Sequence, residues 1–351
     1  MAPGLDSPPN PAAVLSSVGE IVIEDRAVPT PAPDEVVVRV EAVGVCGSDV
    51  HYFQDGRIGS FVLEDPLILG HETAGTVVAA GDDVDPTRVG TRVAIEPGVP
   101  CGRCTLCRTG HYNLCPDVAF HATPPVDGTL QHYVAVRGDF AFALPDTVST
   151  EEGALIEPLS VAVWACRKAN VGLGQSVLIT GAGPIGLLCL QVALAAGASR
   201  VVITDVDEAR LELAASLGAT ATLTADRLDA APEQFDVHLE CSGSLAASRS
   251  GIQRLTRGGT AVLIGMGSSA DLELPVSLIQ ERELVLTGTF RYANCYPAAI
   301  DLVATGRVQV APLVTGRFPL AQTAEALQHS GRPGSVKTLI LPHASPDSKE
   351  K

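Results

Sequence analysis

A glycine-rich turn at residues 180–186 constrains the fold most, because it joins an apolar β-type run to an apolar helical run. Residues 177–180 predict a buried parallel strand, and the residues after the turn predict a helix. Gly181 would permit the tight turn, and Gly183 would let a pyrophosphate approach the backbone. Gly186 would let the helix pack close to the strand. Free N–H groups and the helix dipole would then face the phosphates.

The residues around this turn decide its meaning, since glycine-rich turns also occur in α/β proteins without a nucleotide. A second β-type run, residues 201–204, ends in Asp205, nineteen residues after Gly186. A carboxylate at that spacing and at a strand end accepts hydrogen bonds from the adenosine ribose hydroxyls. The order of strand, turn, helix, strand and acid therefore predicts a dinucleotide site.

Charge and cysteine usage narrow the possible partners. The net charge is -16, and binding a phosphate backbone needs a basic surface, so we expect neither nucleic acid nor an anionic membrane as a partner. No signal-peptide pattern and no run of about 18 apolar residues is visible. Clustered cysteines without an export signal more often bind metal than form disulfides. We therefore expect a cytoplasmic protein.

The chain divides by the spacing of its apolar runs. Residues 1–158 contain short β-type runs broken by Gly and Pro, which predict a β-rich, barrel-like domain. Residues 159–293 alternate strand and helix patterns, which predict a doubly wound parallel sheet. The alternation weakens over residues 294–351, which we expect to rejoin the first domain. The predicted fold class is therefore α/β, with a β-rich barrel-like domain and a doubly wound parallel-sheet domain.

Four cysteines form the most specific pattern in the chain: Cys101, Cys104, Cys107 and Cys115. Four thiolates at this spacing on one loop can close a tetrahedral site around zinc, which leaves no position for substrate. The predicted role is therefore structural. Chance clustering, disulfide pairing and a nucleic-acid-binding zinc ribbon are the alternatives, and the net charge opposes the last.

A second set of metal-ligand residues is spread along the chain: Cys46, His71, Glu72 and Glu157. A catalytic zinc needs few protein ligands and an open position. Each residue alone also fits a structural role, such as a small core cysteine, a core histidine or an acid at a helix N-terminus. The spacing does not show that the four meet.

Taken together, these motifs resemble the zinc-dependent medium-chain dehydrogenases over residues 12–340. More narrowly, the sequence is similar to the sorbitol (L-iditol) dehydrogenase branch, which includes xylitol and arabinitol dehydrogenases. That closer resemblance rests on residues 154–161, on Phe120 before residues 122–125, and on Phe290-Arg291-Tyr292. It implies a GroES-like catalytic domain, an inserted Rossmann domain, a catalytic and a structural zinc, NAD, and a homotetramer.

The resemblance also implies roles for individual residues. Cys46, His71 and Glu72 would hold the catalytic zinc, with Glu157 as a ligand or bonded to the metal's water, and Ser48 and His51 would relay the proton. The substrate would contact Tyr52, Phe120, Glu157, Arg291 and Tyr292. NAD would contact the following residues: Gly181, Gly183, Pro184, Ile185, Gly186, Asp205, Arg210, Ile264, Gly265, Met266, Thr289, Phe290 and Arg291.

The implied reaction is oxidation of a polyol at a secondary hydroxyl to a ketose, with hydride passing to NAD. Zinc would lower the pKa of the hydroxyl, and NAD would accept the hydride. Asp205 would favour NAD, because a 2′-phosphate would meet like charge there, although Arg210 could favour a phosphate. The alternatives are a zinc-dependent alcohol or threonine-type dehydrogenase and, outside enzymes, a zinc-stabilised dinucleotide sensor.

Overall fold

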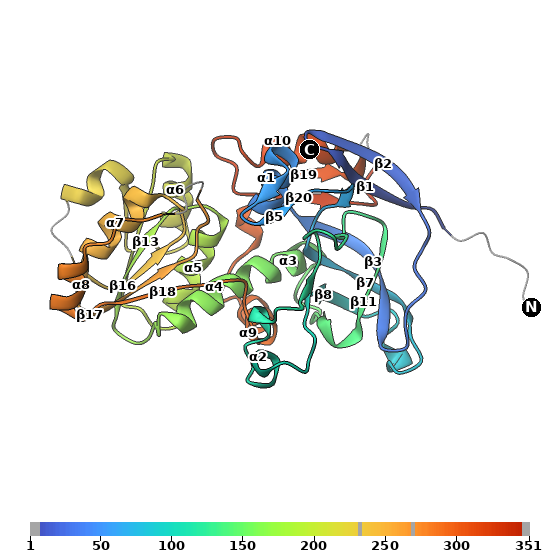
Figure 1. The fold of residues 1–351 in the computed structure, drawn as a ribbon, viewed down its shortest axis with the longest axis horizontal. Coiled ribbons are helices and arrows are strands. Elements are labelled where there is room, and N and C mark those ends of the chain that lie inside the picture. The colour runs from blue at the N-terminus through green and yellow to red at the C-terminus, as the bar shows by residue number, and fades with distance from the viewer. Residues whose placement is uncertain (1–7, 231–233, 268–270, 346–351) are drawn as a thin grey trace, which may run out of the picture. The chain divides into compact units, whose positions relative to one another are not determined.

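The computed structural model describes residues 8–230, 234–267 and 271–345, and its chain forms two compact units (Figure 1). The first unit comprises Met1–Glu157 and Ala311–Lys351, and the second comprises Pro158–Val310. We expected the return to the first unit at residue 294. In the structure the return comes later, because helix α9 (Tyr296–Ala304) belongs to the second unit.

A parallel sheet of six strands forms the centre of the second unit, in the order β15-β14-β13-β16-β17-β18. Its strands are β13 (Ser176–Thr180), β14 (Arg200–Asp205), β15 (Ala221–Thr224), β16 (Phe235–Glu240), β17 (Leu255–Leu263) and β18 (Val285–Gly288). Its helices besides α9 are α4 (Ile156–Lys168), α5 (Pro184–Ala195), α6 (Glu208–Ser216), α7 (Leu245–Gln253), α8 (Val276–Arg282) and the 3-10 turn η4 (Ala225–Ala230). This order is that of a doubly wound dinucleotide-binding fold.

A mixed sheet of seven strands dominates the first unit, in the order β12-β8-β7-β3-β20-β19, with β11 paired to β3. Its strands are β3 (Glu35–Gly44), β7 (Glu72–Ala80), β8 (Arg92–Ile95), β11 (Tyr133–Arg137), β12 (Ala141–Ala143), β19 (Val314–Pro319) and β20 (Lys337–Leu341). Because β20 pairs antiparallel with β3, the end of the chain completes the sheet begun by its start. The β-rich first unit and the doubly wound second unit confirm the predicted α/β class.

Smaller elements complete the first unit. A second sheet contains β1 (Asn10–Ser17), β2 (Glu20–Arg26) and β6 (Leu67–Ile68). Two hairpins contain β4 (Arg57–Ile58) with β5 (Phe61–Val62), and β9 (Gly98–Val99) with β10 (Ala119–Phe120). The helices are α1 (Gly47–Asp55), α2 (Thr105–Arg108), α3 (Thr150–Ala154) and α10 (Thr323–His329). The 3-10 turns are η1 (Pro86–Arg88), η2 (Tyr112–Leu114), η3 (Gly138–Phe140), η5 (Ala311–Leu313) and η6 (Leu320–Gln322).

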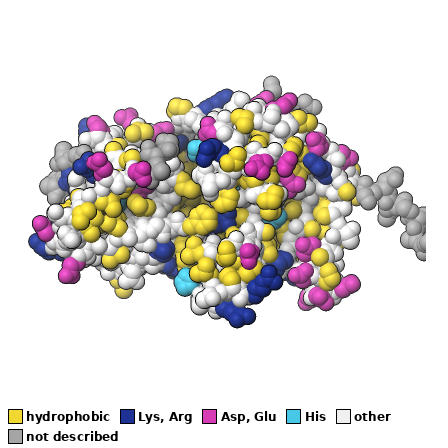
Figure 2. All heavy atoms as spheres, in the orientation of Figure 1, with side chains coloured by type: hydrophobic (Ala, Val, Ile, Leu, Met, Phe, Trp, Pro, Cys, Tyr) yellow, Lys and Arg dark blue, Asp and Glu magenta, His cyan; other side chains and the backbone are white. Residues whose placement is uncertain are grey.

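Burial follows the sequence pattern of each unit. The second unit has continuous buried runs, such as Val177–Ile179 and Val201–Ile203, because helices cover both faces of a parallel sheet. The first unit packs Val36, Val38, Val40 and Val43 of β3 into a barrel core. On the face shown in Figure 2, acidic and basic side chains are interspersed among apolar ones over both units. None of the described helices is long and apolar enough to cross a membrane.

Candidate active site

Strand pairing in the first unit brings three dispersed ligand residues together. Cys46 follows β3 and caps the N-terminus of α1, while His71 and Glu72 stand where β7 begins. Gly44 pairs with Glu72 across the sheet. A Cβ atom at Gly44 would lie 2.0 Å from Glu72 Oε2, so only glycine leaves room for this carboxylate. As a result, donor atoms of Cys46, His71 and Glu72 lie within 4.8 Å of one another.

Asp49 holds two of these ligand residues in place, although the sequence did not single it out for this role. Its Oδ2 accepts a hydrogen bond from the Cys46 amide at 2.9 Å, and its Oδ1 accepts one from the Gly70 amide at 3.0 Å. Oδ1 also lies 3.9 Å from His71 Nδ1. The side chain is fully buried. Its place as third residue of α1, typical of a capping box, was a signal that could have been used.

Lys337 of β20 pairs with the carboxylate of Glu72. Its Nζ lies 2.8 Å and 2.7 Å from the two carboxylate oxygens and donates a further bond to the Val45 carbonyl. Burial acts to lower the pKa of Lys337, but Glu72 and Cys46 outweigh it and raise the pKa, so the ammonium stays charged. Nothing in the sequence near Lys337 indicates this partner, which is 265 residues away along the chain.

The electrostatics of the cluster fit a divalent cation. Burial acts to lower the pKa of His71, but Cys46, Asp49 and Glu157 outweigh it and raise the pKa to about 10. A buried imidazole surrounded by acidic groups marks a place where positive charge is stabilised. One thiolate, one imidazole and one carboxylate are ligands that zinc accepts, and three protein donors leave a position open. Glu157 is buried and acts on this charge, but it lies outside the 4.8 Å set.

The other site residues predicted in the first unit differ in exposure. Ser48 is half-buried, and His51 is exposed, with its Nδ1 3.3 Å from Asp55 Oδ2. Phe120 packs its ring against His71 at 5.5 Å between centroids. Tyr52 is only 1% exposed and packs in the barrel core, because it lies on the inner face of α1.

The four cysteines of the loop also converge. Their sulfur atoms lie within 4.8 Å of one another, with 3.3 Å between Cys104 and Cys107 and 3.9 Å between Cys101 and Cys107. Thiolates bound to one tetrahedral zinc lie about 3.8 Å apart, given a Zn–S distance of about 2.3 Å. The amides of Arg103 and Cys104 lower the pKa of Cys101 to about 6, which favours the thiolate. The loop therefore fits a closed zinc site.

In the second unit, the glycine turn has the geometry that a dinucleotide requires. Gly181 has a φ of +94°, and a Cβ atom there would lie 2.9 Å from the Ser242 amide. Gly183 caps the N-terminus of α5 and faces open space, whereas a Cβ atom at Gly186 would lie 1.8 Å from the Gly181 carbonyl oxygen. Asp205 ends β14 next to the turn, and its Oδ2 accepts a hydrogen bond from the Ala182 amide at 2.5 Å.

The remaining predicted cofactor residues follow the carboxyl ends of neighbouring parallel strands. Ile264, Gly265 and Met266 follow β17, and Thr289 and Phe290 follow β18. This edge is where nucleotides bind in such sheets.

The residues after β18 and β14 add charged groups. The guanidinium of Arg291 lies 4.8 Å from the centroid of the Phe290 ring. Tyr292 is buried against Tyr296, at 5.8 Å between ring centroids. Arg210 Nε lies 3.8 Å from an oxygen of the Asp207 carboxylate.

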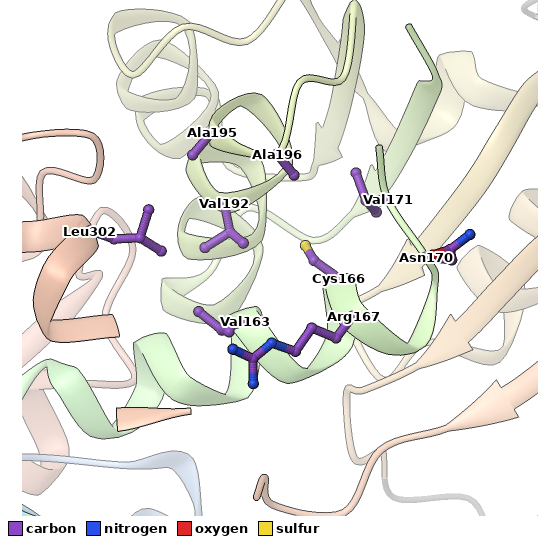
Figure 3. A pocket seen from close by; sticks show the side chains of 9 residues that line it. All are labelled: Val163, Cys166, Arg167, Asn170, Val171, Val192, Ala195, Ala196 and Leu302. Atoms are coloured by element: carbon purple, nitrogen blue, oxygen red, sulfur yellow. The ribbon is translucent and has the colours of Figure 1, made fainter. Parts of the chain in front are cut away.

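A cavity of about 340 Å³ in the second unit is separate from all these residues (Figure 3). It lies between α4, α5 and α9, and Val163, Val192 and Leu302 give it a mainly apolar lining. Arg167, at its edge, donates a hydrogen bond to the Asn294 carbonyl. Because it contains none of the predicted site residues, it is not the candidate active site.

Comparisons with known proteins agree with this geometry. The sequence profile of the alcohol dehydrogenase GroES-like domain matches residues 32–146, and that of the zinc-binding dehydrogenases matches residues 184–305. A Bacillus subtilis sorbitol dehydrogenase is 45% identical over 95% of this chain and 97% of its own. A probable D-xylulose reductase A of Aspergillus clavatus is 42% identical over 97% and 99%.

Solved structures show the same fold. An Escherichia coli oxidoreductase/dehydrogenase of unknown specificity superposes with a TM-score of 0.89 at 36% identity, over 95% of this chain and 99% of its own. The full-length relatives, both domain profiles and the two metal-type clusters agree with the predicted family. This chain belongs to the zinc-dependent medium-chain dehydrogenases, in their sorbitol dehydrogenase-like branch.

Proposed function

We propose that this chain oxidises a polyol at a secondary hydroxyl to the ketose and transfers the hydride to NAD. The observation that carries this proposal is the cluster of half-buried Cys46 with buried His71 and Glu72, in a chain related over 95% of its length to a sorbitol dehydrogenase. A dinucleotide sensor would not need a three-donor metal site with an open position.

The residues of the cluster hold the metal and orient the substrate, while zinc and NAD supply the chemistry. Cys46, His71 and Glu72 would hold zinc, and Glu157 acts electrostatically on His71 of this set. When bound, zinc acts as a Lewis acid that lowers the hydroxyl pKa, and NAD accepts the hydride. Asp49 and Lys337 fix the ligand residues, as hydrogen-bonded outer partners of metal ligands do.

Ser48 and His51 are the proposed proton path to solvent. His51 is exposed on α1, and Ser48 lies on the same helix closer to Cys46. An imidazole can pass a proton between substrate and water near neutral pH. His51→Gln should slow turnover most where solvent base is scarce. An unchanged pH–rate profile in that variant would remove His51 from the mechanism.

The substrate is a polyol because the proposed pocket residues offer hydrogen bonds. In the first unit Glu157 offers acceptors and Phe120 supplies aromatic surface, and in the second unit Arg291 offers donors. A site built for hydroxyls rejects analogues that lack them. Purified enzyme should therefore turn over sorbitol, xylitol or an arabinitol far better than 2-propanol. Comparable efficiency on 2-propanol would place the chain among simple alcohol dehydrogenases, and activity on threonine alone would indicate a threonine-type enzyme.

Asp205 is proposed to select NAD over NADP. Its Oδ1 accepts a hydrogen bond from the Asp207 amide at 2.9 Å, so the carboxylate is held at the end of β14. A 2′-phosphate there would meet like charge. Asp205→Ser should weaken NAD binding and relax the preference, as measured by the ratio of kcat/KM for the two cofactors. A wild-type enzyme that used both equally would refute this assignment.

We also propose a structural zinc at the four cysteines, a homotetrameric assembly and a cytoplasmic location. Strand β18 supports assembly, because it is an edge of its sheet and Val285 on it is 52% exposed. None of the nine cysteines, all of them within the described residues, forms a disulfide, which is typical of a reducing compartment. Light scattering on the purified protein tests the assembly, with a monomer as the contradicting result.

A further inference from the structure

His121 follows Phe120, whose ring packs on the metal-cluster residue His71, and it has no role in the function proposed above. It directly follows β10, whose Phe120 packs on the His71 ring. The His121 amide donates to the Pro97 carbonyl at 3.1 Å, and Ala122 after it has a φ of +55°. His71 is also among the groups that act electrostatically on His121.

The hydrogen bonding of the ring fixes its tautomer. His121 Nδ1 lies 2.9 Å from the Asp127 carbonyl oxygen, and a carbonyl can only accept, so Nδ1 carries the proton. Burial lowers the pKa of His121, which keeps the ring neutral at neutral pH. Nε2 is therefore a hydrogen-bond acceptor. Within residues 8–230, 234–267 and 271–345 it has no partner, yet it is not sealed from solvent.

We propose that His121 Nε2 accepts a hydrogen bond from a polyol hydroxyl other than the one being oxidised, and so selects polyhydroxylated substrates. This inference rests on the proposed polyol oxidation and deepens it. A polyol loses water from every hydroxyl on entering the site, and each donor left without an acceptor weakens binding. Phe120 supplies only apolar surface beside the metal cluster, so a fixed acceptor on the next residue meets a need of this substrate class.

Two substitutions separate the acceptor role of Nε2 from the hydrogen bond that Nδ1 donates to the Asp127 carbonyl. In His121→Asn, the side-chain amide can replace Nδ1–H as donor to the Asp127 carbonyl, but no atom reaches the Nε2 position. In His121→Gln, the amide oxygen reaches that position as an acceptor. His121→Asn should lower kcat/KM for sorbitol or xylitol about 10- to 100-fold, chiefly by raising KM. His121→Gln should recover most of this loss.

Substrate and cofactor controls give the proposal its specificity. The loss in His121→Asn should be much smaller for 2-butanol, which has one hydroxyl, and the KM for NAD should not change. Calorimetric titration of the polyol into the enzyme–NADH complex, which cannot oxidise it, should show weaker polyol binding in His121→Asn than in wild type. Thermal melting monitors the folding of both variants. If His121→Asn does not fold, His121→Gln alone tests the proposal, and a large loss of kcat/KM for the polyol in His121→Gln would overturn it.

The outcomes distinguish this inference from the proposed function. Wild-type efficiency in His121→Asn, equal losses on polyol and 2-butanol, or equal losses in both variants would each overturn the role of His121 while polyol oxidation stands. Failure of the wild-type enzyme to oxidise any polyol would reject the proposed function, and the role of His121 with it.

Discussion

The two metal-type clusters of the first unit differ in how their donors are held. The four thiols come from residues 101–115, and amides of that segment contact them: Cys101 N lies 3.5 Å from Cys115 Sγ, and Cys107 N lies 3.4 Å from Cys104 Sγ. The other cluster takes its donors from Cys46, after β3, and from His71 and Glu72 at the start of β7, and it is supported by Lys337 of β20. The closed cluster, which is the four cysteines, needs only one loop. The open cluster, which is Cys46, His71 and Glu72 with one position left for substrate, requires the assembled sheet. Substrate chemistry therefore depends on the whole first unit.

The largest expected effect comes from removing a ligand of the open cluster. His71→Ala should lower kcat by at least about 10³-fold, because a Lewis-acid metal contributes several kcal/mol to the reaction. Elemental analysis should show one zinc fewer per chain. His111→Ala, which changes an exposed histidine of the thiol loop, is the matched control and should keep both zinc and turnover. Substantial turnover by His71→Ala would place the chemistry elsewhere.

Removing the support of the open cluster should have the next largest effect. Lys337→Met would leave the buried Glu72 carboxylate without its partner, so the free energy of unfolding should fall by about 3–5 kcal/mol. Zinc affinity or turnover should fall about 10- to 100-fold, as for other outer partners of metal ligands. Urea unfolding and zinc titration measure the two effects. Lys337→Arg keeps the charge and should be milder; if the Met variant matches wild type, Lys337 does not support the site.

Removing a ligand of the closed cluster should affect turnover least. Cys104→Ser should lose one zinc and lower the melting temperature or disturb assembly, because a structural metal contributes to folding. The kcat of the folded fraction should stay close to that of wild type. Cys241→Ser, outside both clusters, should keep both zinc ions. If Cys104→Ser retained its full zinc content, the four thiols would not be a zinc site.

A buried histidine outside both clusters sharpens the comparison further. His238 of β16 has no acidic group acting on it, so burial alone lowers its pKa to about 3. Below its unfolded pKa of about 6.5, the unfolded chain binds a proton that the folded chain excludes, so stability is complete above that pH and falls as pH falls.

The slope should be about 1.4 kcal/mol per pH unit between pH 6 and 4. Urea unfolding at several pH values should show this slope reduced in His238→Leu. Equal slopes in the variant and wild type would mean that His238 is protonated in the folded protein.

The parts of the site that local sequence determines were predictable, and those that long-range pairing determines were not. The roles of Gly181 and Gly186 follow from a turn of a few residues, and the four-cysteine loop is contained in one segment. Asp49 was readable from its capping position but was not assigned. The role of Lys337 could not be read from the sequence, because only the pairing of β20 with β3 brings Lys337 to Glu72. The burial of Tyr52, which the resemblance places at the substrate, was not predictable either, because it depends on which face of α1 packs in the core.

The most direct test is to measure zinc content and polyol turnover together during chelation. The open cluster keeps a position for a chelator, whereas four thiolates close the other site. Activity should therefore fall with the first zinc lost per chain, and the second zinc should leave more slowly, with unfolding or disassembly. Full polyol turnover after loss of the first zinc, or activity that follows only the second, would contradict a catalytic metal at Cys46, His71 and Glu72.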